Sequence, residues 1–296
     1  MPQIEIRPAR AEDRDAVLAF CAHTWESGDY IEYVWDSWLH DPEGLLLVAT
    51  SDQQPVGIDH LQMLNATVAW LEGLRVDPNY RHQGIAKAMG EVLMAEAMRR
   101  GAVRVRLMTG STNTASLRLL GQTHMRQVGA FVPFFAAPLS VIPTGDVGVE
   151  RTQLATEDDL DEIVHYLNAS SIFPGLGGFY YFEFRAYSLT AELLEEKIAA
   201  QQVYLLRRWN RLDGLAIAEQ REWEHGGKQL SVGYIDGTTI DTISLIAYDF
   251  RRRLPELELD QVYIYAPDLV MVQDALTGID YKLDGKVFYT FERGLV

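Results

Sequence analysis

The chain has 296 residues, 48% of them hydrophobic and 23% charged, which suits about two soluble globular domains. Its formal charge is −16, with 42 acidic and 26 basic residues, and this argues against a nucleic-acid partner because phosphate binding needs clustered Lys and Arg. No run approaches the roughly twenty apolar residues of a membrane helix, and the N-terminus lacks a signal-peptide pattern. We therefore expect a cytoplasmic protein with no membrane partner. The single cysteine, Cys21, is interpreted as a buried bystander.

The first third of the chain alternates between strand and helix patterns. Residues 4–7 alternate apolar and charged and predict a strand, and residues 7–20 then turn into a helix whose first turn is rich in acids. Residues 25–39 place Tyr30, Tyr33, Val34 and Trp38 near helical spacing, and residues 45–49 and 55–63 predict two strands.

Residues 68–100 predict a strand, a turn and a helix, and this stretch organises the rest. Val68 to Val76 has strand composition, and period-two alternation would put Trp70, Glu72, Leu74 and Val76 on one face. The turn signal at 77–79 is followed by a helix with apolar residues at helical spacing, namely Ile85, Met89, Val92, Leu93 and Ala97.

Gly84 stands at the entry to this helix, where a glycine lets the main chain come close to a ligand. The free N–H groups of a first helical turn, with the positive end of the helix dipole, favour phosphate. The run is neither a P-loop, because no GKS or GKT follows, nor a dinucleotide fingerprint, because GxGxxG is absent.

The pattern RxxGxA after a strand ending in LxVDPxYR resembles the acetyl-CoA signature of the GCN5-related N-acetyltransferases (GNAT), with Arg81, Gly84 and Ala86 at the marked positions. The resemblance implies acetyl-CoA as cofactor, bound by the segment 81–86 and by main-chain groups of the preceding strand. The implied cofactor-binding residues here are Leu74, Val76, Arg81, His82, Gln83, Gly84, Ile85 and Ala86.

Glu72 is the predicted catalytic residue. A carboxylate beside the thioester could take the proton of an acceptor ammonium, since only the neutral amine attacks, and WLEGLRVDP resembles the matching strand of amine-acetylating members. The alternative is a salt bridge at a sheet rim. Gly73 suits a bulge that would splay this strand from its neighbour.

The segment 109–131 resembles the second cofactor segment of the family, with Asn113 and Ser116 at marked positions. Leu120 stands where many members have a tyrosine that protonates the departing thiolate, so Leu120 cannot be the acid. The resemblance also implies that the region between the first two helices lines the acceptor site. It makes Glu26, Tyr30, Tyr33 and Trp35 candidates for substrate binding, although an aromatic stripe at helical spacing is more often core.

The second half of the chain resembles the first in the order of its sequence patterns. TQLATEDDLDEI matches RPARAEDRDAVL, and residues 202–207, 212–220 and 230–236 match the strands before the signature. No RxxGxA follows, and Gly237, Thr238 and Thr239 suit a helix cap better than an anion site. The glycine and aromatic run 173–184 is either a mobile wall of an acceptor site or a loop packed on the core.

The sequence therefore predicts an α/β (α+β) fold of two GNAT-like domains, each a mixed, mostly antiparallel sheet flanked by helices, the second degenerate. We expect the first domain at 1–135, a linker at 136–149 and the second domain at 150–296. Residues 133–148, with three prolines and two glycines, read as linker or crossing segment.

The expected function is acetyl transfer from acetyl-CoA to a primary amine of a small molecule, with no metal. YVWDSWLHDP with EGLRVDP resembles the histidine N-acetyltransferase branch, which implies an amino acid or similar acceptor. Aminoglycosides stay open as acceptors, a non-catalytic acyl-CoA-binding or regulatory module is the rival class, and a homodimer is also left open.

Overall fold

The computed structural model describes residues 4–22, 24, 28–139, 150–222 and 227–295. It contains two compact units. The N-terminal unit consists of Met1–Met108, Ala115–Arg126 and Phe291–Val296, and the C-terminal unit of Thr109–Thr114 and Gln127–Thr290.

The N-terminal unit is a sheet with helices on both faces. Its strands run in the order β1-β2-β3-β4-β5, with the end of β15 next to β5; β1 to β4 are antiparallel, and β4 and β5 are parallel. Its elements are β1 (Ile4–Pro8), α1 (Arg14–Cys21), α2 (Ile31–Leu39), β2 (Gly44–Ser51), β3 (Gln54–Asn65), β4 (Val68–Val76), α3 (Ile85–Arg99), β5 (Arg104–Gly110), α4 (Thr114–Leu120) and β15 (Phe288–Gly294).

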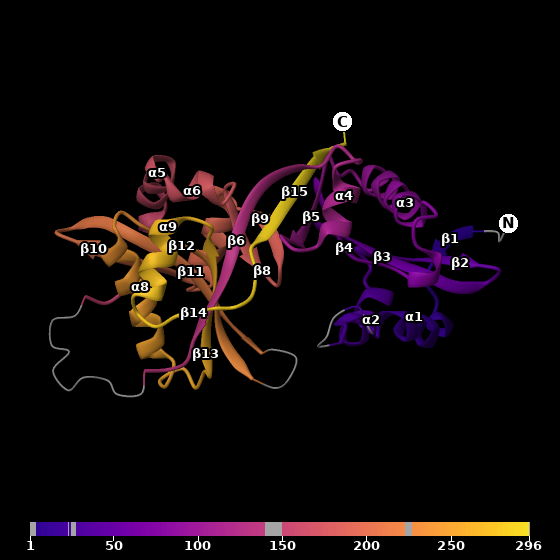
Figure 1. Cartoon of the computed structure of the whole chain (residues 1–296). Helices are drawn as coiled ribbons and strands as arrows, with labels where there is room; N and C mark the ends of the chain where they lie inside the picture. The colour runs from indigo at the N-terminus through magenta and orange to yellow at the C-terminus, as the bar shows by residue number, and fades with distance from the viewer. Residues whose placement is uncertain (1–3, 23, 25–27, 140–149, 223–226, 296) are drawn as a thin grey trace. The chain divides into compact units, whose positions relative to one another are not determined.

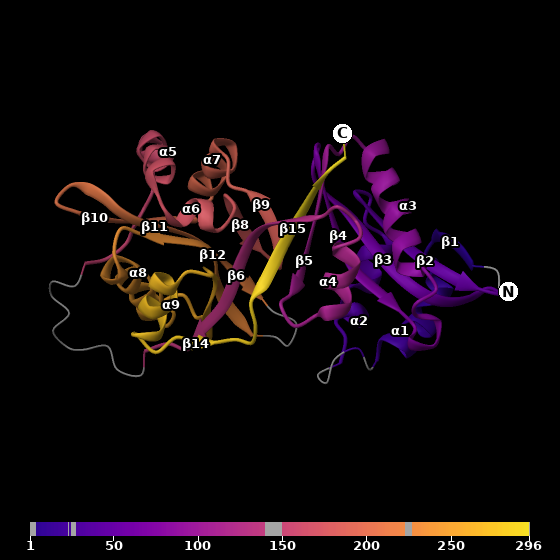
Figure 2. The same cartoon turned by 45° about the horizontal axis from the view of Figure 1, so that its top comes forward.

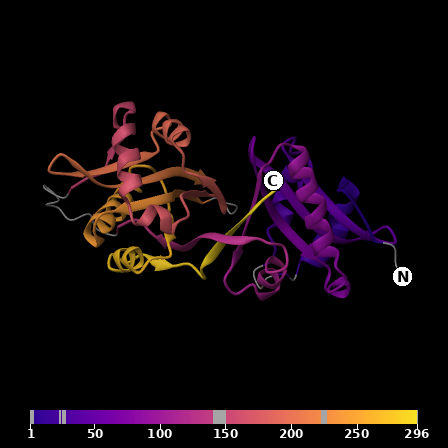
Figure 3. The same cartoon turned by 90° about the horizontal axis from the view of Figure 1, so that it is seen from above.

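The two faces of this sheet carry different helices, as Figure 1 shows. Helices α1 and α2 pack through Val17, Ile31 and Trp35 on one face, with Leu46 and Val48 of β2. Helix α3 packs on the other face with Leu47, Ala49 and Leu71, and Figure 3 shows it from above, in purple, lying over the strands. The alternation of β2 residues between two helix layers is what a strand buried on both sides requires.

The apolar faces of two helices differ in detail from the predicted ones. In α2 the buried residues are Ile31, Trp35 and Trp38, whereas Tyr33 is 57% exposed. In α3, Ile85, Met89, Leu93 and Ala97 are buried as expected, but Val92 is 40% exposed.

The C-terminal unit repeats this plan. Its strands run in the order β6-β13-β12-β11-β10-β7, with β14 pairing β6; α8 and α9 lie on one face and α5 to α7 on the other, as Figure 2 shows. Its elements are β6 (Arg126–Ala136), β7 (Gln153–Leu154), α5 (Leu160–Ala169), α6 (Ile172–Gly175), β8 (Phe179–Phe182), β9 (Arg185–Ser188), α7 (Ala191–Ala199), β10 (Val203–Arg208), β11 (Arg211–Glu222), β12 (Lys228–Gly237), α8 (Ile240–Arg253), β13 (Gln261–Pro267), α9 (Val270–Thr277) and β14 (Lys282–Leu283).

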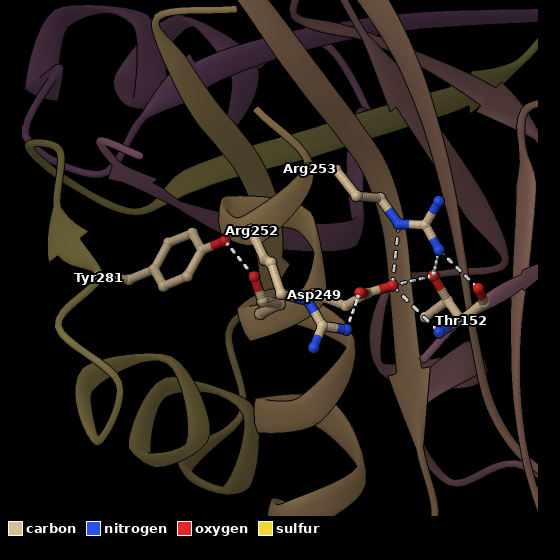
Figure 4. Close-up of polar contacts among 6 residues, drawn as sticks. Thr152, Asp249, Arg252, Arg253 and Tyr281 are labelled. Atoms are coloured by element: carbon tan, nitrogen blue, oxygen red, sulfur yellow. Dashed lines mark hydrogen bonds and ion pairs between the residues drawn. The ribbon is translucent and has the colours of Figure 1, made fainter. Parts of the chain in front are cut away.

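The start of this repeat is fastened to α8 by Asp249, which is 1% exposed (Figure 4). Its carboxylate accepts hydrogen bonds from the Thr152 amide (3.0 Å) and hydroxyl (2.5 Å) and from the guanidinium groups of Arg252 (2.5 Å) and Arg253 (2.9 Å). Burial opposes ionisation, but these donors outweigh it and hold the pKa of Asp249 below its usual value.

The boundaries of the two units differ from the expected domains at 1–135 and 150–296, because each unit is built from more than one segment of the chain. Pro133 lies inside β6, so the first residues of the predicted crossing segment are strand. Residues 140–149 of the expected linker lie outside the described residues. The last residues of the chain belong to the N-terminal unit, where Glu292 pairs with Arg106 (2.7 Å). No length or composition pattern signals such a return of the chain end.

Candidate active site

Strand β4 opens away from β5 where the sequence predicted a splay. The two strands pair only from Val68 with Arg104 to Leu71 with Leu107, although both continue further. On its other side, β4 shifts register against β3, because Ile58 pairs with Arg75 while His60 pairs with Glu72. The extra residue falls around Gly73, whose φ of +79° suits a glycine bulge.

The bulge also corrects one expectation. Beyond it the alternation is reset, so Val76 packs with the α3 cluster while Arg75 shares the α1/α2 face with Glu72. The predicted common face for Glu72, Leu74 and Val76 is therefore wrong, since a one-residue insertion inverts every later side chain.

Glu72 reaches the α2 side through a histidine. Its Oε1 lies 3.1 Å from Nδ1 of His60 on β3, and the two side chains are 15% and 0% exposed. The His60 ring is stacked on Trp38 of α2, with ring centroids 4.3 Å apart and planes 7° from parallel. Glu72 is thus partly buried and held by a specific partner, and it does not sit at an open sheet rim.

Arg75 neutralises the neighbouring carboxylate. Its guanidinium donates to Asp29 through Nε (2.8 Å) and Nη2 (3.2 Å), and it lies 5.3 Å from the ring centroid of Tyr30. Asp29 is 3% exposed and committed to this pair, so Glu72 is the better placed of the two carboxylates for an incoming amine. Neither the His60–Glu72 pair nor the Arg75–Asp29 pair could be predicted directly from the sequence, because both depend on the position of the bulge.

The N-terminus of α3 presents unused donors. Gly84 is the N-cap with φ +82°, no side chain caps the helix, and the first assigned amide donor is Ala88, which bonds the Gly84 carbonyl (3.0 Å). For the N–H groups of His82 to Lys87, no protein acceptor is assigned within the described residues. A Cβ at residue 84 would meet nothing within 4 Å, so a ligand has room to approach the main chain there.

The roles of the other predicted cofactor-binding residues stay predictions, and the structure shows only where these residues lie and what they contact. Arg81, His82 and Gln83 are exposed, and Arg81 donates from Nε to the Val76 carbonyl (3.1 Å). The Leu74 carbonyl accepts from Arg75 (3.0 Å). Ile85 is 3% exposed, so its side chain belongs to the core and only its amide can meet a ligand.

A pocket of about 510 Å³ lies beside the same turn, inside the N-terminal unit. It is bounded by α1, the start of β3 and the turn after β4, through Ala16, Ala19, Phe20, Thr24, Gln54, Pro55, Val56, Asp77, Pro78, Asn79, Tyr80 and Arg81.

Cys21 is not a nucleophile here, because burial raises the pKa of its thiol to about 12.

The predicted acceptor residues divide into three groups. Glu26 lies outside the described residues. Tyr30 and Tyr33 are 37% and 57% exposed and can meet a ligand. Trp35 is 0% exposed in the cluster under α2, so this candidate is corrected to a core residue, in line with the alternative that aromatic stripes usually pack inside.

The second cofactor segment spans both units. Ser116 lies in α4 with the N-terminal unit, and Asn113 lies in the segment Thr109–Thr114 that is grouped with the C-terminal unit. Leu120, at the position of the family's tyrosine, is 4% exposed and acts as a core residue.

The C-terminal unit has lost the equivalent chemistry. Val232 in β12 corresponds to Leu71 in β4, because each is the last residue of its strand that pairs with the parallel neighbour. The pairing with the antiparallel neighbour likewise makes Asp236 equivalent to Arg75. Gly233 therefore occupies the position of Glu72. A Cβ there would lie 2.1 Å from the Tyr181 carbonyl oxygen, so β8 fills the space of a side chain. Within the run 173–184, Phe179, Tyr180 and Tyr181 are therefore buried, whereas Phe184 is 39% exposed.

The helix that follows is also closed to phosphate. The N-terminus of α8 is capped by the Thr239 hydroxyl, which accepts from the Thr242 amide (3.2 Å). The Asp213 carboxylate accepts from the Thr242 hydroxyl (2.6 Å) and adds negative charge at the point where a phosphate would bind.

Among the described residues, no group of three or more His, Cys, Asp or Glu side chains could hold a metal ion. Among the same residues, every helix is too short or too polar to span a bilayer.

Comparisons with known proteins agree with this description. Residues 12–124 match the model of the Acetyltransferase (GNAT) family. No curated protein matches the sequence.

Among solved structures, a GCN5-related N-acetyltransferase from Sphaerobacter thermophilus superposes with a TM-score of 0.62 at 12% identity, covering 99% of this chain and 96% of that one. A tandem GNAT protein from the clavulanic acid biosynthesis pathway gives 0.55 at 13% identity, covering 99% of each chain. A fungal multi-domain GH3 β-N-acetylglucosaminidase with a GCN5-related glucosamine N-acetyltransferase region gives 0.62 at 11% identity, covering 99% of this chain and 38% of that one.

At these identities the solved structures establish the shared tandem fold, and the family match falls on the unit that carries the splayed strand and the uncapped helix. Residues 12–124, most of which belong to the N-terminal unit, are thus the part of the chain that matches the Acetyltransferase (GNAT) family, and the chain as a whole shares the fold of tandem GNAT proteins.

Proposed function

We propose that the N-terminal unit transfers the acetyl group of acetyl-CoA to a primary amine of a small molecule, by direct attack within a ternary complex. The observation that carries the proposal is one strand, β4, which leaves its neighbour immediately before Glu72 and is followed, after the turn at 77–83, by the uncapped N-terminus of α3. A thioester lying along the opened strand, with its diphosphate on the amides of 82–87, would place its carbonyl near Glu72.

The chemistry supplied by acetyl-CoA is an activated acyl group. The chain supplies orientation and a base: main-chain N–H groups hold the negative diphosphate, and Glu72 accepts a proton from the acceptor ammonium, directly or through water. Cys21, the only cysteine, is buried and protonated, so it offers no route through an acylated thiol.

The acceptor class is proposed as an amino acid or a similar amine, from the resemblance to the histidine branch. Amino sugars, aminoglycosides among them, are the second candidate, favoured by the glucosamine N-acetyltransferase region in one solved structure of the same fold. Tyr30 is exposed and interacts electrostatically with Glu72, so a cationic acceptor could lie beside an aromatic ring there.

The test is release of free thiol from acetyl-CoA with a panel of amino acids, polyamines and aminoglycosides. Turnover with any amine is expected, and Glu72→Gln should lower kcat by about 10²–10⁴-fold at neutral pH. Affinity for acetyl-CoA should stay unchanged in that variant.

Two results would contradict the proposal. Full activity of Glu72→Gln would remove the base. Tight binding of acetyl-CoA without turnover across the panel would favour a non-catalytic acyl-CoA-binding module.

A further inference from the structure

His60 lies on β3 directly opposite Glu72, one residue pair before the bulge. The pairing places both side chains on the α1/α2 face, where Nδ1 of His60 and Oε1 of Glu72 are 3.1 Å apart. Because the bulge begins after this pair, it leaves the contact in regular antiparallel register.

The histidine ring has no freedom to turn away. It is 0% exposed and lies parallel to the Trp38 indole at 4.3 Å. A hypothetical Cβ on Gly44 would lie 2.8 Å from Nε2, which shows how closely the β2 main chain approaches the far side of the ring. Close packing on both sides fixes the ring plane and keeps Nδ1 directed at Glu72.

The far nitrogen indicates which tautomer is present. Nε2 is buried and has no hydrogen-bond partner among the described residues. A proton on Nε2 would leave a buried donor unpaired, whereas an Nδ1–H donates to the Glu72 carboxylate, so the Nδ1–H tautomer is favoured over the Nε2–H tautomer.

We propose that His60 is a positioning residue for Glu72: its Nδ1–H orients the carboxylate and keeps it ionised to receive the proton of the acceptor amine. The inference rests on the proposed function, because it concerns how the base of that reaction is held. Trp38 and Gly44 act one step further out by fixing the ring.

Several other ionisable groups lie near the His60–Glu72 pair and contribute to its electrostatic environment. They are Asp59 on β3, Arg75 on β4, Asp29 and Tyr30 just before α2, and Asp41 in the turn before β2. Among them, Arg75 donates to Asp29 in a bidentate contact.

The experiment compares two substitutions at one position. His60→Leu keeps apolar bulk and removes the donor, while His60→Asn keeps a donor nitrogen bonded to Cγ, as Nδ1 is in histidine. In His60→Leu we expect kcat to fall about tenfold or more and the acidic limb of the kcat–pH profile to move up by about one unit, because a donor to the carboxylate is lost. His60→Asn should keep the limb near its wild-type position, and both should bind acetyl-CoA normally.

Each outcome of this comparison either supports or overturns the positioning role of His60. A wild-type pH profile in His60→Leu, or the same profile in both variants, would overturn the positioning role even if kcat falls. A fully active Glu72→Gln variant would instead refute the proposed function, so the two failures are distinguishable.

A measurement on the unaltered protein covers the case in which the variants do not fold. Long-range ¹⁵N–¹H correlation of the histidine rings should show His60 protonated at Nδ1 and bare at Nε2 at neutral pH. The opposite tautomer would overturn the proposal.

Discussion

Asp59, the residue next to His60, is 3% exposed, and its carboxylate accepts a hydrogen bond from the His60 amide (3.1 Å). Burial raises the pKa of Asp59 well above its usual value. The folded state therefore holds this proton more tightly than the unfolded state, and its contribution to stability is lost as pH rises from about 4 towards the folded pKa.

Asp59→Asn should consequently raise the midpoint of urea unfolding at pH 7 and flatten the dependence of that midpoint on pH. The amide oxygen can still accept from the His60 amide, and the cost of ionising a buried group is removed. Urea titrations at pH 5 and pH 8 test this, and a variant less stable than the wild type at pH 8 would contradict it.

Asp249 shows the opposite case. Four donors meet its buried carboxylate and lower its pKa, so its stabilising effect is present above pH 4 and is lost as pH falls below it. Asp249→Ala should cost about 3–5 kcal/mol, since it removes a buried carboxylate that accepts from the guanidinium of Arg252, itself 2% exposed. Chemical unfolding at pH 7 measures this, and a loss under 1 kcal/mol would show that the cluster is dispensable.

Among the elements, the turn from β4 into α3 carries the prediction with the best internal control. Gly84 and Gly285 have φ of +82° and +83°, and a Cβ at either meets nothing within 4 Å. Alanine at either position should cost a similar amount of unfolding free energy, about 1 kcal/mol, because both force a left-handed backbone on a side chain.

Only Gly84→Ala should weaken acetyl-CoA binding, by about tenfold or more, since only there would a diphosphate meet the main chain. Calorimetric titration of both variants checks this. Equal affinities in the two would count against the assignment of 82–87 to the diphosphate.

At the same scale, the sequence predicted β4 to the residue, the glycine bulge and the splay, because composition, turn signals and glycine carry that information locally. It did not predict which residues face which helix beyond the bulge. That depends on the register against β3, a pairing between distant residues that no local pattern encodes, and the same register creates the His60–Glu72 and Arg75–Asp29 pairs.

For the molecule as a whole, the tandem arrangement was predictable from the repeat, and so was the loss of chemistry in the second copy. The return of the chain end to the N-terminal unit was not, since residues 291–295 look like any short strand. The burial of Trp35 could not be predicted either, because the sequence pattern of an aromatic residue is the same whether its side chain lines a binding site or packs in the core beneath it.

The chain end supplies a test at this scale. Glu292→Ala would leave Arg106, whose side chain is 2% exposed, without the Glu292 carboxylate, at a cost of about 2 kcal/mol because Glu292 is itself partly exposed. Hydrogen exchange should accelerate in β4 and β5 of the N-terminal unit and not in β11 or β12. Glu256→Ala, at an exposed position of the C-terminal unit, is the control. Equal effects in both units would contradict the grouping of 291–296 with the N-terminal unit.

The binding of the coenzyme A diphosphate by the amides of 82–87 is tested most directly by an amide-resolved NMR titration of the whole chain with coenzyme A. We expect the N–H resonances of His82 to Lys87 to shift on binding, while those of Thr238 to Thr242, at the capped start of α8, stay in place. Unmoved resonances at 82–87, or equal shifts at both helix starts, would contradict it.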